Sequence, residues 1–121
     1  MPEESSSTVK IYYPRLSRDE LLEKLRKASE KLAKVLPLKA VILFGSYAEG
    51  RQTAASDIDV LVIYEGAKRK DVYKVCWDVF SLSQLELHVY TEEEYRSLES
   101  AGSMLPKVIR EKGIVIWRAG S

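Results

Sequence analysis

The hydrophobic and polar positions of the first half of the chain predict one helix followed by two strands. The helix starts after Ser17, which has capping-box spacing to Glu20, and its pattern ends before Pro37. Its apolar positions recur at helical intervals: Leu21, Leu22, Leu25, Ala28, Leu32, Val35 and Leu36. Residues 38–44 and 58–64 are short apolar runs, each of which predicts a strand buried on both faces.

Two buried strands require layers on both sides of the sheet: helices on each face, or helices on one and a partner on the other. The connection over residues 45–56 is twelve residues long, the lower limit for a parallel crossover. The relative direction of the two strands therefore stays open.

The second half of the chain also predicts both helices and strands. Residues 68–82 predict an amphipathic helix, with apolar positions at Val72, Val75, Cys76, Val79 and Phe80. Residues 85–91 alternate as in a strand, so that Glu86, His88 and Tyr90 share the face opposite Leu85, Leu87 and Val89. Two helices, over residues 91–102 and 103–113, and a strand over 114–117 complete an α/β (α+β) pattern with about four strands.

The length and composition of the chain predict a single folded domain. At 121 residues the chain is long enough for one core, and we expect a domain over residues 11–121. Residues 1–10 are expected to be a disordered tail, because the Ser- and Glu-rich start lacks apolar periodicity.

Charge and cysteine content exclude several classes of function. The 19 Lys and Arg residues nearly balance 18 Asp and Glu residues, so a long nucleic acid is not the expected partner. The single cysteine and single histidine cannot form a disulfide or a zinc-ligand set, which fits a reducing cytoplasm. No apolar run approaches the roughly 20 residues that span a bilayer, so no membrane association is expected.

The candidate chemistry lies where the two central strands meet their connection. Asp57 and Asp59 alternate onto one face of a strand about 6.6 Å apart, a spacing that suits divalent metal. Gly45 allows close approach of the backbone to a ligand. Ser46 is the expected N-cap of residues 47–49, whose free N–H groups favour a phosphate. The stretch therefore predicts a triphosphate site at Gly45 and Ser46 with magnesium at the two aspartates.

An isolated Asp-x-Asp is usually a pair of solvated turn residues, but here it follows Phe44-Gly45-Ser46 by ten residues. This pattern resembles the minimal nucleotidyltransferases of the DNA polymerase beta superfamily. The resemblance implies their fold, with a mixed central sheet, and two Mg²⁺ ions bound by Asp57, Asp59 and a third carboxylate. Glu86 is the candidate for that carboxylate, which in the family ligates the catalytic metal and accepts a proton.

Two residues near this pattern need separate interpretation. Many relatives carry Arg where this chain has Glu49, which adds negative charge near the proposed phosphates. Its capping-box spacing from Ser46 predicts a structural role, and Arg51 could offset its charge. His88 shares a face with Glu86, although a lone histidine is more often a hydrogen-bonded strand residue. The basic run of residues 68–70 is interpreted as a solvated surface.

The resemblance implies transfer of a nucleoside monophosphate, with ATP the expected donor, to a hydroxyl with release of pyrophosphate. Family members of this size are often encoded beside a helical HEPN protein, and some attach AMP to its tyrosine as antitoxins. A HEPN protein or a second copy of the chain is therefore the expected partner. The alternatives are an inactive nucleotide- or partner-binding subunit and a small-molecule nucleotidyltransferase of the aminoglycoside-modifying kind.

Overall fold

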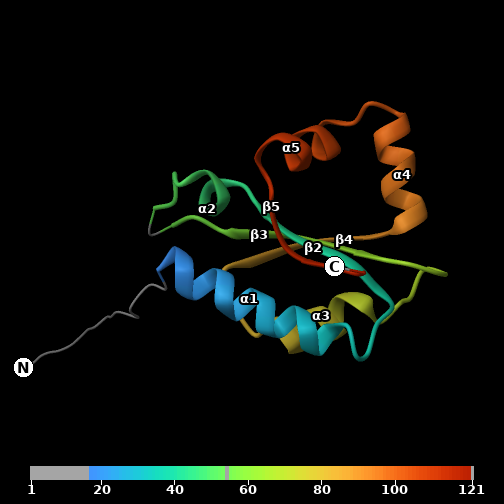
Figure 1. The fold of residues 1–121 in the computed structure, drawn as a ribbon, viewed down its shortest axis with the longest axis horizontal. Helices are drawn as coiled ribbons and strands as arrows, with labels where there is room; N and C mark the ends of the chain where they lie inside the picture. Colours follow the sequence, from blue (N-terminus) through green and yellow to red (C-terminus); the bar gives the residue numbers. More distant parts are fainter. Residues whose placement is uncertain (1–16, 54, 121) are drawn as a thin grey trace, which may run out of the picture.

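The fold is built on a four-stranded mixed sheet, seen in a computed structural model that describes residues 17–53 and 55–120. The expected tail of residues 1–10 lies outside the described residues. The strands are β2 (Leu38–Phe44), β3 (Ile58–Tyr64), β4 (Leu85–Thr91) and β5 (Ile114–Arg118). They lie side by side in the order β4-β3-β2-β5, and Figure 1 shows the sheet between two layers of helices.

The strand direction that the sequence left open is antiparallel for β2 and β3, whose connection includes the short helix α2 (Ser46–Glu49). β5 is also antiparallel to β2. Strand β4 is parallel to β3, and the helix α3 (Val72–Phe80) makes the crossover between them. The expectation of a mixed sheet flanked by helices is confirmed.

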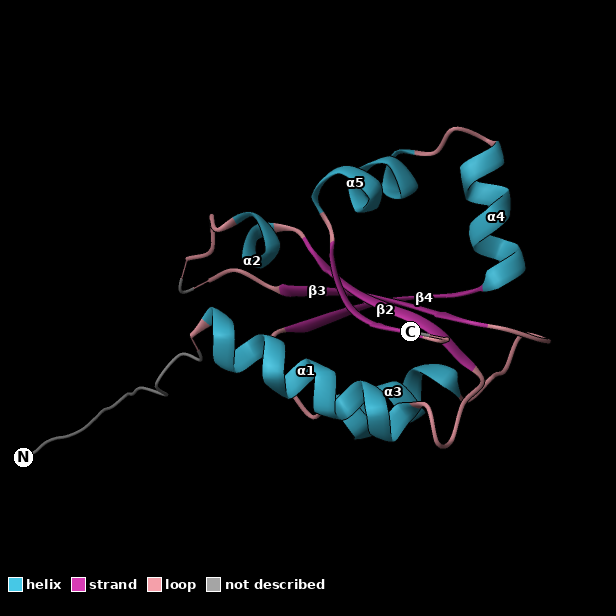
Figure 2. Cartoon of the chain, viewed as in Figure 1, coloured by secondary structure: helices cyan, strands magenta, loops and turns pink. Residues whose placement is uncertain are grey.

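Helices cover both faces of the sheet (Figure 2). The helices α1 (Arg18–Leu32) and α3 lie on one face, while α4 (Glu92–Ser100) and α5 (Met104–Lys112) lie on the other. The capping box of Ser17 and Glu20 is formed as predicted. No helix in the described ranges has the length and apolar character needed to cross a membrane.

Two helices are shorter than their sequence patterns. The apolar pattern before Pro37 extends to Leu36, but α1 ends at Leu32. Leu36 is buried although it lies in the turn that follows the helix, and Val35 in the same turn is 54% exposed. α3 begins only at Val72, and Arg69 stabilises the preceding turn through Asp71 and the Val35 carbonyl. The basic run that contains Arg69 is therefore not simply a solvated surface.

Alternation along the strands divides the apolar residues between two clusters. The larger one lies under α1 and α3 and includes residues with no solvent exposure: Val41, Leu43, Val60, Val62 and Cys76. Burial raises the pKa of the Cys76 thiol to about 12, so the thiol stays protonated at neutral pH. The smaller cluster, under α4 and α5, consists of Ile42, Phe44, Leu61, Ile63 and Ile109.

Candidate active site

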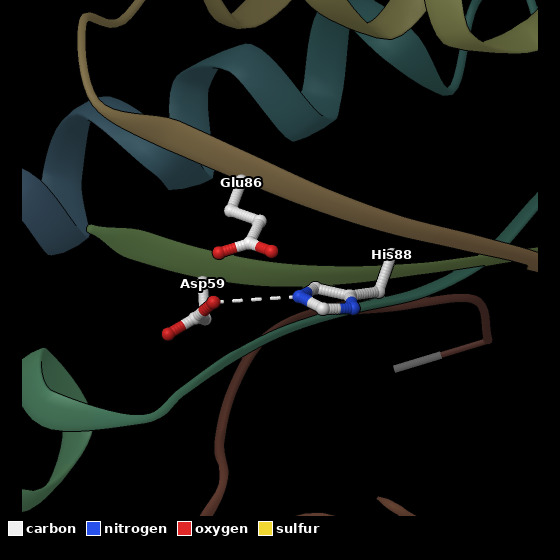
Figure 3. Close-up of side chains that lie close together, drawn as sticks. All are labelled: Asp59, Glu86 and His88. Carbon is white, nitrogen blue, oxygen red and sulfur yellow. Dashed lines mark hydrogen bonds and ion pairs between the residues drawn. The ribbon is translucent and has the colours of Figure 1, made fainter.

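The site lies on the sheet face that carries the smaller cluster, at the end where β3 begins. Asp59 is in phase with Leu61 along β3 and therefore points to the same face. In the parallel register, Asp59 pairs with Glu86 and Leu61 pairs with His88. The expected alternation of β4 is confirmed, and it brings Glu86 and His88 beside Asp59 (Figure 3).

The three side chains form a compact polar group. His88 Nε2 lies 3.3 Å from Asp59 Oδ1, and one ligand atom from each of Asp59, Glu86 and His88 lies within 4.8 Å of the others. The Asp59 and His88 side chains are 23% and 27% exposed, and Glu86 is exposed. The Phe44 ring meets the imidazole edge-on, with the ring centroids 4.9 Å apart. The group is therefore open to solvent on one side and packed on the other.

The backbone of Gly45 lies directly against the Asp59 carboxylate of this group. A Cβ atom built on Gly45 would lie 2.4 Å from Asp59 Oδ2, and the residue has φ +77°, which side chains rarely allow. A glycine is therefore required both by the backbone conformation and by the carboxylate. The requirement inferred from the sequence, close approach of the backbone at this turn, has a specific partner in Asp59.

The predicted cap of α2 is shifted by one residue. Gly45 is the N-cap, without a side-chain hydrogen bond, and Ser46 is the first helical residue. The capping box predicted between Ser46 and Glu49 was wrong, because a capping box requires the serine at the N-cap itself. The positive φ of Gly45 turns the chain one residue earlier than the serine would have done.

The Glu49 carboxylate forms ion pairs with two cationic side chains. It lies 3.2 Å from Arg51 Nε and 3.7 Å from Lys112 Nζ of α5. The hydrogen bond from Arg51 lowers the pKa of Glu49 below its ordinary value. Arg51 thus offsets the charge of Glu49, as the sequence allowed, and Glu49 helps to connect the α2 segment to α5.

Asp57 occupies a different position from the other candidates. It precedes the first residue of β3, is exposed, and among the described residues is not part of the group formed by Asp59, Glu86 and His88. His88 was interpreted from the sequence as an ordinary hydrogen-bonded strand residue, yet it lies within the group. The signal that could have identified it was its spacing of two from Glu86 on the polar face of the strand.

The residues present fit a divalent cation. Two carboxylates provide oxygen ligands of the kind that Mg²⁺ and Mn²⁺ prefer, and an imidazole nitrogen lies within reach of the same point. The absence of a side chain at Gly45 lets the Asp59 carboxylate lie directly against the backbone of this turn. A mixed sheet with a Gly-Ser turn against a strand-borne carboxylate defines a candidate nucleotide-binding enzyme.

Comparison with known proteins identifies the family. Residues 22–116 match the model of the nucleotidyltransferase domain family. This match covers most of the chain, and the protein therefore belongs to the nucleotidyltransferase domain family.

Curated relatives match over a shorter segment. A protein of Methanocaldococcus jannaschii, named "Putative protein adenylyltransferase", is 44% identical over 45 residues. That segment is 37% of this chain and 46% of the relative, so the chain spans about half the length of the curated relative that it matches.

Solved structures show the same fold at low identity. A crystal structure of a "putative nucleotidyltransferase from Sulfolobus solfataricus" has a TM-score of 0.59 and 24% identity, with 84% of each chain covered. A complex of a tri-AMPylated Shewanella oneidensis HEPN toxin with an MNT antitoxin has a TM-score of 0.53 and 18% identity, covering 85% of this chain and 74% of that one. The expected nucleotidyltransferase fold is therefore supported by structure as well as by sequence.

Proposed function

We propose that this protein transfers AMP from ATP to an acceptor hydroxyl and releases pyrophosphate. The observation that carries the proposal is the contact between the Gly45 turn and the Asp59 carboxylate, where an added Cβ would lie 2.4 Å from Oδ2. This contact puts a backbone suited to phosphate directly against a side chain suited to metal. Gly45 and Ser46 would bind the triphosphate, and Asp57, Asp59 and Glu86 would bind two Mg²⁺ ions.

The chemistry assigns a role to each residue. The acceptor oxygen attacks the α-phosphorus of ATP. The bond between the α-phosphorus and the oxygen that bridges to the β-phosphate breaks, and pyrophosphate leaves with the bonding electrons. Glu86, which is exposed beside Asp59, takes the proton of the attacking hydroxyl. Magnesium, when bound, would polarise the phosphoryl oxygens and neutralise the leaving pyrophosphate.

The acceptor that we propose is a tyrosine of a helical partner protein of the HEPN kind. Support comes from the curated relative, whose name is that of a protein adenylyltransferase, and from the structurally similar complex of an AMPylated HEPN toxin with an MNT antitoxin. ATP and Mg²⁺ are available in the cytoplasm, where we place the reaction. A second copy of the chain is the alternative partner.

Pyrophosphate release from labelled ATP, measured with Mg²⁺ and the helical partner protein, tests the proposal. The variant Asp59→Asn should lose at least about a hundredfold in turnover, because it removes a charge at the centre of the site. Asp78→Asn, on the solvent side of α3, is the matched control and should behave as the wild type. Equal turnover by Asp59→Asn and wild type would contradict the assignment.

Mass spectrometry identifies the acceptor in the same reaction. A partner tyrosine should gain the mass of one AMP. If nucleotide binds but no pyrophosphate forms, the chain is an inactive binding subunit. If a small molecule such as an aminoglycoside gains AMP and no protein does, the transfer chemistry stands and the protein acceptor does not.

A further inference from the structure

We propose that Asp59, Glu86 and His88 together form a mixed carboxylate–imidazole metal centre that prefers a first-row transition ion, such as Mn²⁺, over Mg²⁺. This inference rests on the proposed function and adds to it a nitrogen ligand and a metal preference. It concerns the ion position shared by Asp59 and Glu86, and it leaves the position served by Asp57 to oxygen ligands.

The distances within the group match those around a bound ion. Ligand atoms about 2.1 Å from a metal lie about 3.0 Å apart at right angles and about 3.4 Å apart in a tetrahedron. His88 Nε2 and Asp59 Oδ1 are 3.3 Å apart, within that range. Glu86 completes the group within 4.8 Å, and its exposed, flexible side chain can close the remaining separation by rotation.

A hydrogen bond to Asp59 and coordination of a metal are two alternative roles for the same nitrogen of His88. A charge-assisted N–H···O⁻ bond is commonly about 2.7–2.9 Å long, shorter than the 3.3 Å observed. The two roles also require opposite states of one atom. Nε2 must carry a proton to donate to Asp59, whereas it must be deprotonated to bind a metal.

The sheet positions the imidazole as a rigid ligand. His88 pairs with Leu61 in the parallel register, two residues beyond the pair of Asp59 and Glu86, so adjacent strands hold all three side chains on one face. The Phe44 ring packs edge-on against the imidazole and limits its rotation. Ligands on packed strands keep their geometry better than ligands on loops.

The donor set determines which ion is favoured. Mg²⁺ binds oxygen ligands and retains several of its waters, so a nitrogen ligand adds little to its affinity. Imidazole nitrogen suits transition ions, whose affinities also exceed that of Mg²⁺ at such sites. A site built from two carboxylates and one imidazole therefore favours Mn²⁺ and later ions.

The chain contains one histidine, which makes the test unambiguous. Protein purified without a histidine tag is loaded with Mn²⁺, and pulsed electron paramagnetic resonance is used to detect ¹⁴N modulation from a coordinated imidazole. The wild type should show this modulation, and His88→Gln should not. Tyr90→Phe, the next residue on the same face of β4, is the matched control and should retain it.

Competition between ions gives a second measurement. His88→Gln should lower Mn²⁺ affinity about tenfold or more, while Mg²⁺ affinity changes less than about twofold. Circular dichroism establishes that the variant is folded. Wild-type protein that binds Mn²⁺ without ¹⁴N modulation, or a variant with unchanged Mn²⁺ affinity, would overturn the proposal.

The two proposals fail in different ways. If imidazole modulation is present but pyrophosphate is never released, the metal centre stands and the nucleotidyl-transfer proposal falls. If pyrophosphate is released and no nitrogen signal appears, His88 is only a neighbour of Asp59 and the mixed centre is wrong.

Discussion

The two faces of the sheet are made from the same strands but are used differently. On the face covered by α1 and α3, Val41, Leu43, Val60 and Val62 are fully excluded from solvent and form part of one large cluster. On the face covered by α4 and α5, the apolar cluster is smaller, and the polar group of Asp59, Glu86 and His88 lies at the end where β3 begins.

The difference shows how a small domain separates stability from chemistry. Charged groups are costly to bury without partners, so they can be retained only where one side stays open to solvent. The two-residue periodicity of a strand allows one segment to serve both faces, because neighbouring residues point in opposite directions. Asp59 lies between Ile58 and Val60, which are buried in the large cluster on the other face.

The largest effect on stability is expected from Leu43→Ala. Leu43 is fully buried on the α1 and α3 face, and removal of its side chain leaves a cavity that should lower the free energy of unfolding by about 2–5 kcal/mol. Asp59→Asn is nearly isosteric and should change it by less than about 1 kcal/mol. Urea titration of both variants measures these values.

Activity should show the reverse order. Folded Leu43→Ala should retain nucleotidyl transfer per folded molecule, and Asp59→Asn should lose it. Equal losses of activity per folded molecule in the two variants would mean that the two faces are not functionally separate.

The second prediction concerns the glycine turn next to Asp59. Gly45→Ala should lower the free energy of unfolding by about 1–3 kcal/mol through backbone strain, with a further cost from the contact with Asp59 Oδ2. Gly50→Ala is the comparison variant: Gly50 also has a positive φ, +74°, but it lies in the αL region, which is less costly for alanine, and nothing lies within 4 Å of an added Cβ. Thermal unfolding and pyrophosphate release are measured for both.

Gly45→Ala should lose more activity than Gly50→Ala when each is measured below its unfolding temperature, because only Gly45 contacts a proposed metal ligand. Similar losses of activity in the two variants would show that the strain of a positive φ alone accounts for the effect.

The sequence predicted the elements better than their three-dimensional relations. Alternation and helical spacing identified the strands and helices, and the polar face of β4 was read correctly from Glu86 and His88. The contact between His88 and Asp59 could not be predicted, because it depends on the pairing of β3 with β4 across 29 residues. Local capping rules placed the N-cap of α2 at Ser46, but the turn conformation available to Gly45 determined the outcome.

The third prediction compares the N-caps of two helices, α1 on one face of the sheet and α4 on the other. Thr91 caps α4 and Ser17 caps α1, each in a capping box with a glutamate. Replacement by alanine should cost about 1 kcal/mol in either helix. The consequence should differ, because α1 buries Leu21, Leu25 and Leu32 in the large cluster while α4 buries none of its residues.

Hydrogen exchange distinguishes the two variants. Thr91→Ala should increase exchange throughout α4, since packing does not replace the lost cap, and Ser17→Ala should increase it only in the first turn of α1. Equal, local changes in both helices would show that α4 is stabilised by packing to the same extent as α1.

The smallest effect is expected from Glu49→Gln. Arg51 and Lys112 already compensate its charge, and the pair is close to solvent, where salt screens the interaction. Because the pKa of Glu49 is lowered in the folded protein, the pair stabilises the fold above the unfolded-state pKa, about 4.3, and this contribution is lost as the pH falls through the lower folded-state value. At pH 7 the variant should therefore melt slightly below the wild type, and the difference should shrink as the pH falls below the unfolded-state value.

The KM of Glu49→Gln for ATP should differ from that of the wild type by less than about twofold, since a carboxylate paired with two cations presents little negative charge to a triphosphate. If the KM for ATP instead fell by about tenfold, the charge of Glu49 would be repelling the nucleotide directly, and the nucleotide site would include the α2 segment.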